Sequence, residues 1–337
     1  MQTADLAVLD SAQIRALTTQ SIAALDATQV GALNSDQVKA LTTTQIRAMD
    51  AEDVAGLTSA NIGVLDSAQL RMLSTAQLDA MSPDQLAGLS STQIASLTTQ
   101  QIANLEAGDL ASLSVTQFDG LTTAQIVALT TTQVQAMETA DLASLSSDQF
   151  RALQTDDIAA LDPTQVGAIG TAQAAAMTSA QLRAIDAEDM SALTTDALAA
   201  VSTGQIRGLT SAQLAALTPE QMASLTAAQM AAMTTDQLAG LDANQLTGLN
   251  TSQFSKLSTA QIASLTTEQI SLLETADFAA MTTLQIGALT TQQIEAIQPD
   301  TFMALTTAQA AALSTAQVRA ITTADLAAME TADLAAL

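Results

Sequence analysis

Two apolar positions recur every eight residues along the whole chain. From Gln2 to Leu337 the sequence divides into 42 octads without an insertion or a deletion. We number the positions of each octad 1 to 8, so that Ser82 is position 1 and Leu89 is position 8 of "SPDQLAGL". Positions 5 and 8 are apolar in every octad, position 1 is Ser, Thr, Asp or Asn in 34, and position 4 is Gln in 29. This repetition predicts one repeat architecture, a single uninterrupted solenoid over residues 1–337.

Each octad predicts one short α-helix. A continuous helix is excluded, because eight residues advance about 80° beyond two turns and would spread the apolar positions around its surface. Ser, Thr, Asp or Asn followed three residues later by Gln is a capping box, which begins a helix at position 1. Proline occurs only at position 2, the first helical residue, where its missing N–H costs nothing: Pro83, Pro163, Pro219 and Pro299. We therefore expect a helix of about six or seven residues in every octad.

Octads that begin with Glu or Gln exchange the long and short capping partners. Six of them carry Asp three residues on: Gln2, Glu106, Glu138, Gln154, Glu274 and Glu330; only Gln298 is followed by Thr301. These pairs predict the same helix end, bonded in reverse.

Such short helices must stack, because isolated helices below about 12 to 15 residues are marginal in water. All five Phe residues occupy position 5 and seven Met residues occupy position 8, as expected for a core. The recurrence of Phe and Gly indicates three or four octads per superhelical turn. A β-solenoid is the alternative fold, but the chain lacks period-2 alternation and is rich in helix-forming Ala, Gln, Leu and Met. The sequence favours an all-α solenoid of 42 short helices.

Charged residues follow the repeat as well. Of the 34 acidic residues, 31 lie at positions 1, 3 or 4, whereas all nine basic residues lie at positions 6 or 7. Each sign is near the helix end that the macrodipole favours, and the seven Arg residues at position 6 are expected in solvent. The net charge of −25 argues against nucleic-acid binding and against binding to an anionic membrane. No apolar run is long enough for membrane insertion.

The composition limits the available chemistry. The chain contains no Cys, His, Trp or Tyr, which excludes disulfides, thiolate or imidazole metal ligands and Ser-His or Cys-His nucleophiles. No pair of carboxylates stands apart from the repeat as a general acid and base would. We therefore predict no enzyme activity, no catalytic, cofactor-binding or metal site, and no cofactor.

The octads resemble a known kind of repeat array. "TTAQIVAL" at 122–129 and "STAQIASL" at 258–265 are similar to the Thr-, Ala-, Gln- and Leu-rich octapeptide arrays of very long bacterial surface proteins of the adhesin type. The resemblance covers the whole chain. It implies a mechanical or adhesive role outside the cell or at its surface, and it assigns no functional residue.

Architecture favours a structural function. An unbroken register without binding loops predicts a rod, stalk or filament subunit. The first octad, "QTADLAVL", and the last, "ETADLAAL", lack the polar caps of solenoid ends. We expect either neighbouring sequence or self-association, lateral or end-to-end, at these faces. The alternative is an α-solenoid binding module for a protein or peptide, including an acidic rod that mimics DNA.

Overall fold

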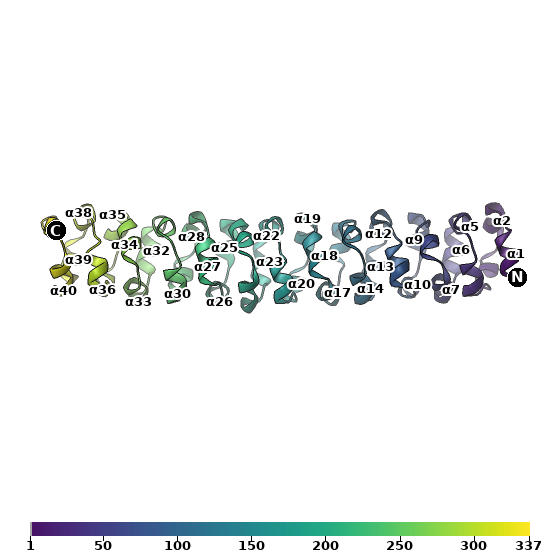
Figure 1. Ribbon diagram of the computed structural model, residues 1–337, viewed down its shortest axis with the longest axis horizontal. Helices are drawn as coiled ribbons and strands as arrows, with labels where there is room; N and C mark the ends of the chain where they lie inside the picture. Colours follow the sequence, from purple (N-terminus) through teal and green to yellow (C-terminus); the bar gives the residue numbers. More distant parts are fainter. Residues whose placement is uncertain (1) are drawn as a thin grey trace. The chain divides into compact units, whose positions relative to one another are not determined.

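The computed structural model describes residues 2–337 and divides them into two compact units. Unit 1 extends to Ala168 and unit 2 runs from Ile169 to Leu337. Helices follow one another along each unit, purple to teal in unit 1 and teal to yellow in unit 2 (Figure 1). No strand occurs between residues 2 and 337. Each unit is an all-α solenoid, which confirms the predicted fold class.

The helices of unit 1 have these bounds: α1 Thr3–Ala7, α2 Ser11–Ala16, α3 Thr19–Ile22, α4 Ala27–Gly31, α5 Ser35–Ala40, α6 Thr43–Ala48, α7 Ala51–Gly56, α8 Ser59–Ile62, α9 Ser67–Met72, α10 Thr75–Asp79, α11 Pro83–Ala87, α12 Ser91–Ser96, α13 Thr99–Asn104, α14 Ala107–Ala111, α15 Val115–Asp119, α16 Thr123–Val127, α17 Thr131–Ala136, α18 Thr139–Ser144, α19 Ser147–Ala152, α20 Thr155–Ala159 and α21 Pro163–Gly167.

The helices of unit 2 have these bounds: α22 Thr171–Ala176, α23 Ser179–Ala184, the 3₁₀-helix η1 Ala187–Ala192, α24 Thr195–Ala200, α25 Thr203–Gly208, α26 Ser211–Ala215, α27 Pro219–Ser224, α28 Ala227–Ala232, α29 Thr235–Ala239, α30 Ala243–Thr247, α31 Thr251–Phe254, α32 Thr259–Ser264, α33 Thr267–Ser271, α34 Thr275–Ala280, α35 Thr283–Gly287, α36 Thr291–Ala296, α37 Pro299–Phe302, α38 Thr307–Ala310, α39 Thr315–Ala320, α40 Thr323–Ala328 and α41 Thr331–Leu334.

Every octad forms one helix, but the helices are shorter than the sequence predicts. They span four to six residues rather than six or seven. Two extended residues separate consecutive helices, as between α12 and α13, where Leu97 has φ −62° and ψ 148° and Thr98 has φ −73° and ψ 156°. Both conformations suit any L-residue. The helices therefore end without a glycine in the left-handed conformation, and no described residue has a positive φ.

The capping box begins most helices as predicted. In α16 the Thr122 hydroxyl accepts from the Gln125 N–H at 3.2 Å, and Gln125 Oε1 accepts from the Thr122 N–H at 2.8 Å. In the reversed pairs of α1 and α20, Asp5 and Asp157 accept from the backbone N–H of Gln2 and Gln154.

The Glu residues at position 1 differ from this pattern. At Glu106, Glu274 and Glu330 the N-cap side chain makes no capping bond. Each of these carboxylates precedes an Asp three residues on, and two like charges cannot bond to each other. Reversed capping is therefore confirmed for Gln and is not found for these Glu residues.

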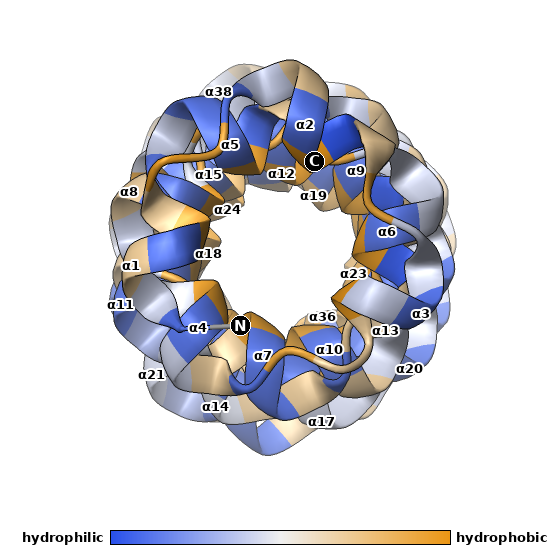
Figure 2. Cartoon of the chain, turned by 90° about the vertical axis from the view of Figure 1, so that its right-hand side faces the viewer, coloured by the Kyte–Doolittle hydropathy of each residue, from blue (hydrophilic) through white to orange (hydrophobic). Residues whose placement is uncertain are grey.

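Positions 5 and 8 form the core of each unit. In unit 1 the side chains at position 5, from Leu6 to Val166, are at most 1% exposed, and those at position 8, from Leu33 to Leu161, are 3–5% exposed. The N-terminal helices nearest the viewer in Figure 2, such as α2, α6 and α7, turn their apolar residues inward. Phe118, Phe150, Phe254, Phe278 and Phe302 are all buried, as expected for core-filling side chains.

Each helix packs against the helix three octads away, as α4 packs against α7 and α33 against α36. Side-chain hydrogen bonds also join octads four apart in the sequence, across 28 and 31 residues. A turn of the superhelix therefore holds between three and four octads, and the expectation of three or four is met by both spacings. The exposed Arg71 adds a bond of the first kind, because its Nε donates to the Ser96 carbonyl at 2.8 Å.

The packing of α4 on α7 depends on glycine. A Cβ atom on Gly56 would overlap the carbonyl oxygen of Ala27 and approach its Cα to 3.0 Å. A Cβ on Gly108, by contrast, would meet no atom within 4 Å.

We therefore expect opposite effects from two Gly-to-Ala changes in unit 1. Gly56→Ala should lower the free energy of unfolding by about 1–3 kcal/mol, because the α4 backbone must move away. Gly108→Ala should raise it by up to about 1 kcal/mol, because alanine favours the helix and nothing obstructs its methyl group. Urea unfolding followed by circular dichroism measures both, and equal effects would contradict the close contact.

Candidate interaction surfaces

The glutamine at position 4 has a second role that the sequence did not reveal. While Oε1 of Gln125 accepts from its own N-cap, Nε2 donates to the carbonyls of Ile94 at 2.8 Å and Leu97 at 2.9 Å. These carbonyls belong to positions 5 and 8 of the octad four earlier. Gln125 is 1% exposed, so every polar atom of this buried amide is bonded. We call this arrangement the glutamine bridge.

The glutamine bridge recurs through both units. Residues that donate to both carbonyls in the same way include Gln37, Gln45, Gln77, Gln101, Gln117 and Gln133 in unit 1 and Gln205, Gln245, Gln253, Gln269, Gln285, Gln293 and Gln317 in unit 2. One sequence signal indicates it. A capping box accepts Glu as readily as Gln, yet no octad has Glu at position 4.

Aspartate at position 4 leaves the bridge unmade. Asp277 is 4% exposed and takes the place from which a glutamine would donate to Leu246 and Leu249, 31 and 28 residues earlier. An ionised carboxylate has no proton to donate. Burial, reinforced by the charge of Glu274, raises the pKa of Asp277 to about 6. Burial likewise raises the pKa of Asp53, Asp141 and Asp157.

These carboxylates do not converge on a metal. Among residues 2–337 no group of three or more acidic side chains has the geometry to hold an ion. The predictions of no metal site, no cofactor and no enzyme activity remain predictions.

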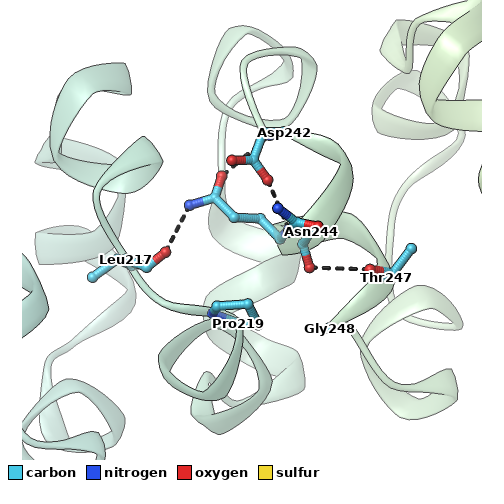
Figure 3. Close-up of a pocket in the computed structure, with 7 residues that line it drawn as sticks. Leu217, Pro219, Asp242, Asn244, Thr247 and Gly248 are labelled. Atoms are coloured by element: carbon cyan, nitrogen blue, oxygen red, sulfur yellow. Dashed lines mark hydrogen bonds between the residues drawn. The ribbon is translucent and has the colours of Figure 1, made fainter.

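Surface depressions lie between consecutive turns of the solenoid. One of about 410 Å³ is lined by Leu217, Pro219, Asp242, Asn244, Gln245, Thr247 and Gly248 (Figure 3). Its polar groups bond to one another: Gln245 Nε2 donates to the Leu217 carbonyl at 2.9 Å, and the Thr247 hydroxyl donates to the Asn244 carbonyl at 3.1 Å. The depression is thus relief of the repeat, with its side chains already used for capping and bridging.

Acidic residues of unit 1 gather along one line of the solenoid. The helices α4, α7, α11, α14, α18 and α21 are separated by three or four octads in turn, so each lies one superhelical turn from the next. Gln85 of α11 bridges to Val54 and Leu57 beside α7, and α18 packs on α21. Their octads contain no Lys or Arg and ten acidic residues, which we call the acidic stripe: Asp26, Asp50, Glu52, Asp53, Asp84, Glu106, Asp109, Glu138, Asp141 and Asp162.

Most of the acidic stripe faces solvent. Asp26, Asp50, Glu52, Asp84, Glu106, Glu138 and Asp162 are exposed, while Asp53 and Asp141 are buried at position 4. The basic residues of unit 1 lie in other octads, at Arg15, Lys39, Arg47, Arg71 and Arg151, and all are exposed as predicted. The stripe is the largest departure from uniformity that we find on the surface of unit 1.

Large apolar side chains that are exposed within the units occur singly. They are Met72, Val115 and Val127 in unit 1 and Leu284 and Met303 in unit 2. Scattered exposure of this kind indicates no contiguous apolar surface. None of the described helices has the length and apolar character needed to cross a membrane.

The bridge predicts the effect of restoring it. Asp277→Gln should raise the free energy of unfolding at pH 7 by about 1–2 kcal/mol, because the amide can donate to Leu246 and Leu249. The gain should shrink as the pH falls from 7 through 6 toward 3.8, because the folded chain binds the Asp277 proton more tightly than the unfolded chain does.

Chemical denaturation between pH 4 and pH 8 measures this effect. The reciprocal variant, Gln125→Glu, is the matched control. It keeps the N-cap acceptor but places a carboxylate against two carbonyls, so it should destabilise the chain most at neutral pH. A pH-independent loss in Gln125→Glu would contradict the role of the amide donor.

Comparisons with known proteins agree with this repeat structure. A sequence model of the ALTTAQ repeat matches residues 1–35, 30–67, 62–99, 102–138, 134–171, 197–227 and 270–307, more than half of the chain. A comparison with curated proteins gives no match. The successive matches begin about four octads apart in the N-terminal part of the chain, the spacing that the glutamine bridge spans. The chain belongs to the ALTTAQ repeat family.

Proposed function

We propose that the chain is a structural, non-enzymatic repeat protein that provides an elongated rod, stalk or filament. The observation that carries this proposal is the glutamine bridge, which joins each octad only to octads in the adjacent turns. A solenoid with nearest-neighbour contacts gains length with every added octad and needs no new core design. The absence of insertions in 42 octads is consistent with selection for length rather than for a binding loop.

Extracellular placement, at a bacterial cell surface, is part of the same proposal. Its support is the similarity of the octads to arrays of adhesin-like surface proteins and the absence of cysteine. The net charge of −25 would keep neighbouring rods apart and in solution. Association of the rods end to end, discussed below, would extend them into filaments.

Small-angle X-ray scattering of a register-preserving deletion tests the rod. Removing residues 66–121 takes out seven whole octads and joins Leu65 to Thr122. Gln125 then faces Val38 and Leu41, which Gln69 bridges in the full chain. We expect the maximum dimension to fall by about one sixth with an unchanged cross-section, because length is additive in octads.

The control deletion removes residues 66–125, which is not a whole number of octads, and should unfold the junction. A radius of gyration near 20 Å, roughly that of a globular chain of this length, would overturn the rod.

The acidic stripe favours one alternative, a module that binds a basic protein in the manner of DNA. Converting Asp26, Asp50, Glu52, Asp84, Glu106 and Glu138 to their amides should then weaken binding to an oligolysine peptide. The control converts Asp10, Asp36, Asp66, Asp119, Asp148 and Asp156, which have the same total charge but lie outside the stripe. Equal losses of affinity, measured by titration calorimetry, would reduce the effect to net charge and overturn this alternative.

A further inference from the structure

The C-terminal face of unit 2 exposes apolar side chains that are buried elsewhere. Position 5 is at most 1% exposed from Leu198 to Ala310, but Leu326 is 36% and Leu334 is 41% exposed, and Leu337 at position 8 is 39% exposed. Within the units the octads of the following turn cover these positions. We call this surface, with the carbonyls of Val318, Ile321, Leu326 and Met329, the tail face.

The tail face also presents backbone acceptors. Inside the units, Nε2 of a glutamine four octads later donates to the position 5 and position 8 carbonyls, as Gln293 does to Ile262 and Leu265. The equivalent donor for Val318 and Ile321 would lie in an octad after Leu337. These carbonyls are therefore without a glutamine bridge in the described chain.

The N-terminal face of unit 1 has the complementary features. Leu9, Leu17 and Leu25 at position 8 are partly exposed, whereas Leu33 in the next octad is 4% exposed. Gln13 has its Oε1 in the capping position, where it accepts from the Asp10 N–H at 2.9 Å. Its side chain is exposed, since no octad precedes it by four. We call this surface the head face.

We infer that the tail face binds the head face of a second copy of this chain, in the register that continues the octads. In that register Gln13 of the second copy occupies the place from which its Nε2 donates to the carbonyls of Val318 and Ile321. Leu9 and Leu17 of the second copy cover the apolar side chains of the tail face. The inference rests on the proposed structural function and names the partner and the register of its end-to-end contact.

Donors and acceptors select the head-to-tail arrangement. Two tail faces would oppose carbonyl oxygens to carbonyl oxygens, without a hydrogen-bond donor between them. The contact is heterologous, so each added copy leaves one free face of each kind and the assembly propagates. Because both copies are acidic, salt should promote the contact by screening their repulsion.

Two variants block one face each. Leu334→Glu places a charge on the tail face at an exposed position, and Gln13→Glu replaces the amide donor of the head face with an acceptor. Val127→Glu is the matched control for the first, because Val127 is 49% exposed on α16, away from both faces. All three changes are at exposed side chains, so the fold should persist, and circular dichroism checks this.

Sedimentation velocity of the full chain over a concentration series, at low and moderate salt, is the experiment. We expect the unmodified chain and Val127→Glu to form polymers that lengthen with concentration and salt. Leu334→Glu and Gln13→Glu alone should each need at least about tenfold higher concentration to associate. An equimolar mixture of these two variants should form dimers and nothing larger, because only one free head and one free tail match.

The outcomes separate this inference from the proposed function. Polymers that are unaffected by both blocking variants, or self-association of Leu334→Glu into dimers through its heads, would overturn the head-to-tail register. Elongated particles that stay monomeric at every concentration would overturn the contact and leave the rod intact. Compact particles would overturn the rod, and with it this inference.

Discussion

The glutamine bridge is the interaction on which the rest of this solenoid depends. One amide bonds in two directions: its oxygen accepts from the N–H that begins its own helix, and its nitrogen donates to two carbonyls of the octad four earlier. Gln125 shows both sets of bonds at 2.8–2.9 Å. A helix of four to six residues leaves most of its backbone groups outside intrahelical bonds. The bridge satisfies these groups with the neighbouring turn, so local helix formation and superhelical packing become one event.

The bridge also explains how a chain can break its helix every eight residues without turn-forming residues. Two extended residues, such as Leu97 and Thr98, are sufficient, because the chain reverses nothing and only redirects the next helix around the axis. Glycine is then needed only where helices approach most closely, as at Gly56. The core requires nothing more than an apolar side chain at positions 5 and 8, which is why Val, Ile, Leu, Met and Phe exchange freely there.

Aspartate in place of the bridging glutamine introduces a cost that the repeat otherwise avoids. The carboxylate of Asp277 is buried and faces backbone acceptors, and its raised pKa reflects that environment. In unit 1 the same substitution occurs at Asp53, Asp109 and Asp141, all within the acidic stripe. Local stability and surface charge are therefore linked, since the octads that hold the most negative charge are also those that lack the bridge.

The sequence by itself determined the helical elements and their register. The capping pair at positions 1 and 4, the prolines at position 2 and the apolar residues at positions 5 and 8 are local signals, and each acts within one octad. They predicted an all-α solenoid with a buried Phe118 and an exposed Arg71. Only the tertiary structure decided how many octads form a turn, because that number depends on contacts across 28 and 31 residues. The acidic stripe followed from it: Asp50, Glu106 and Asp162 are 56 residues apart, a spacing that places them on one line only when two turns hold seven octads.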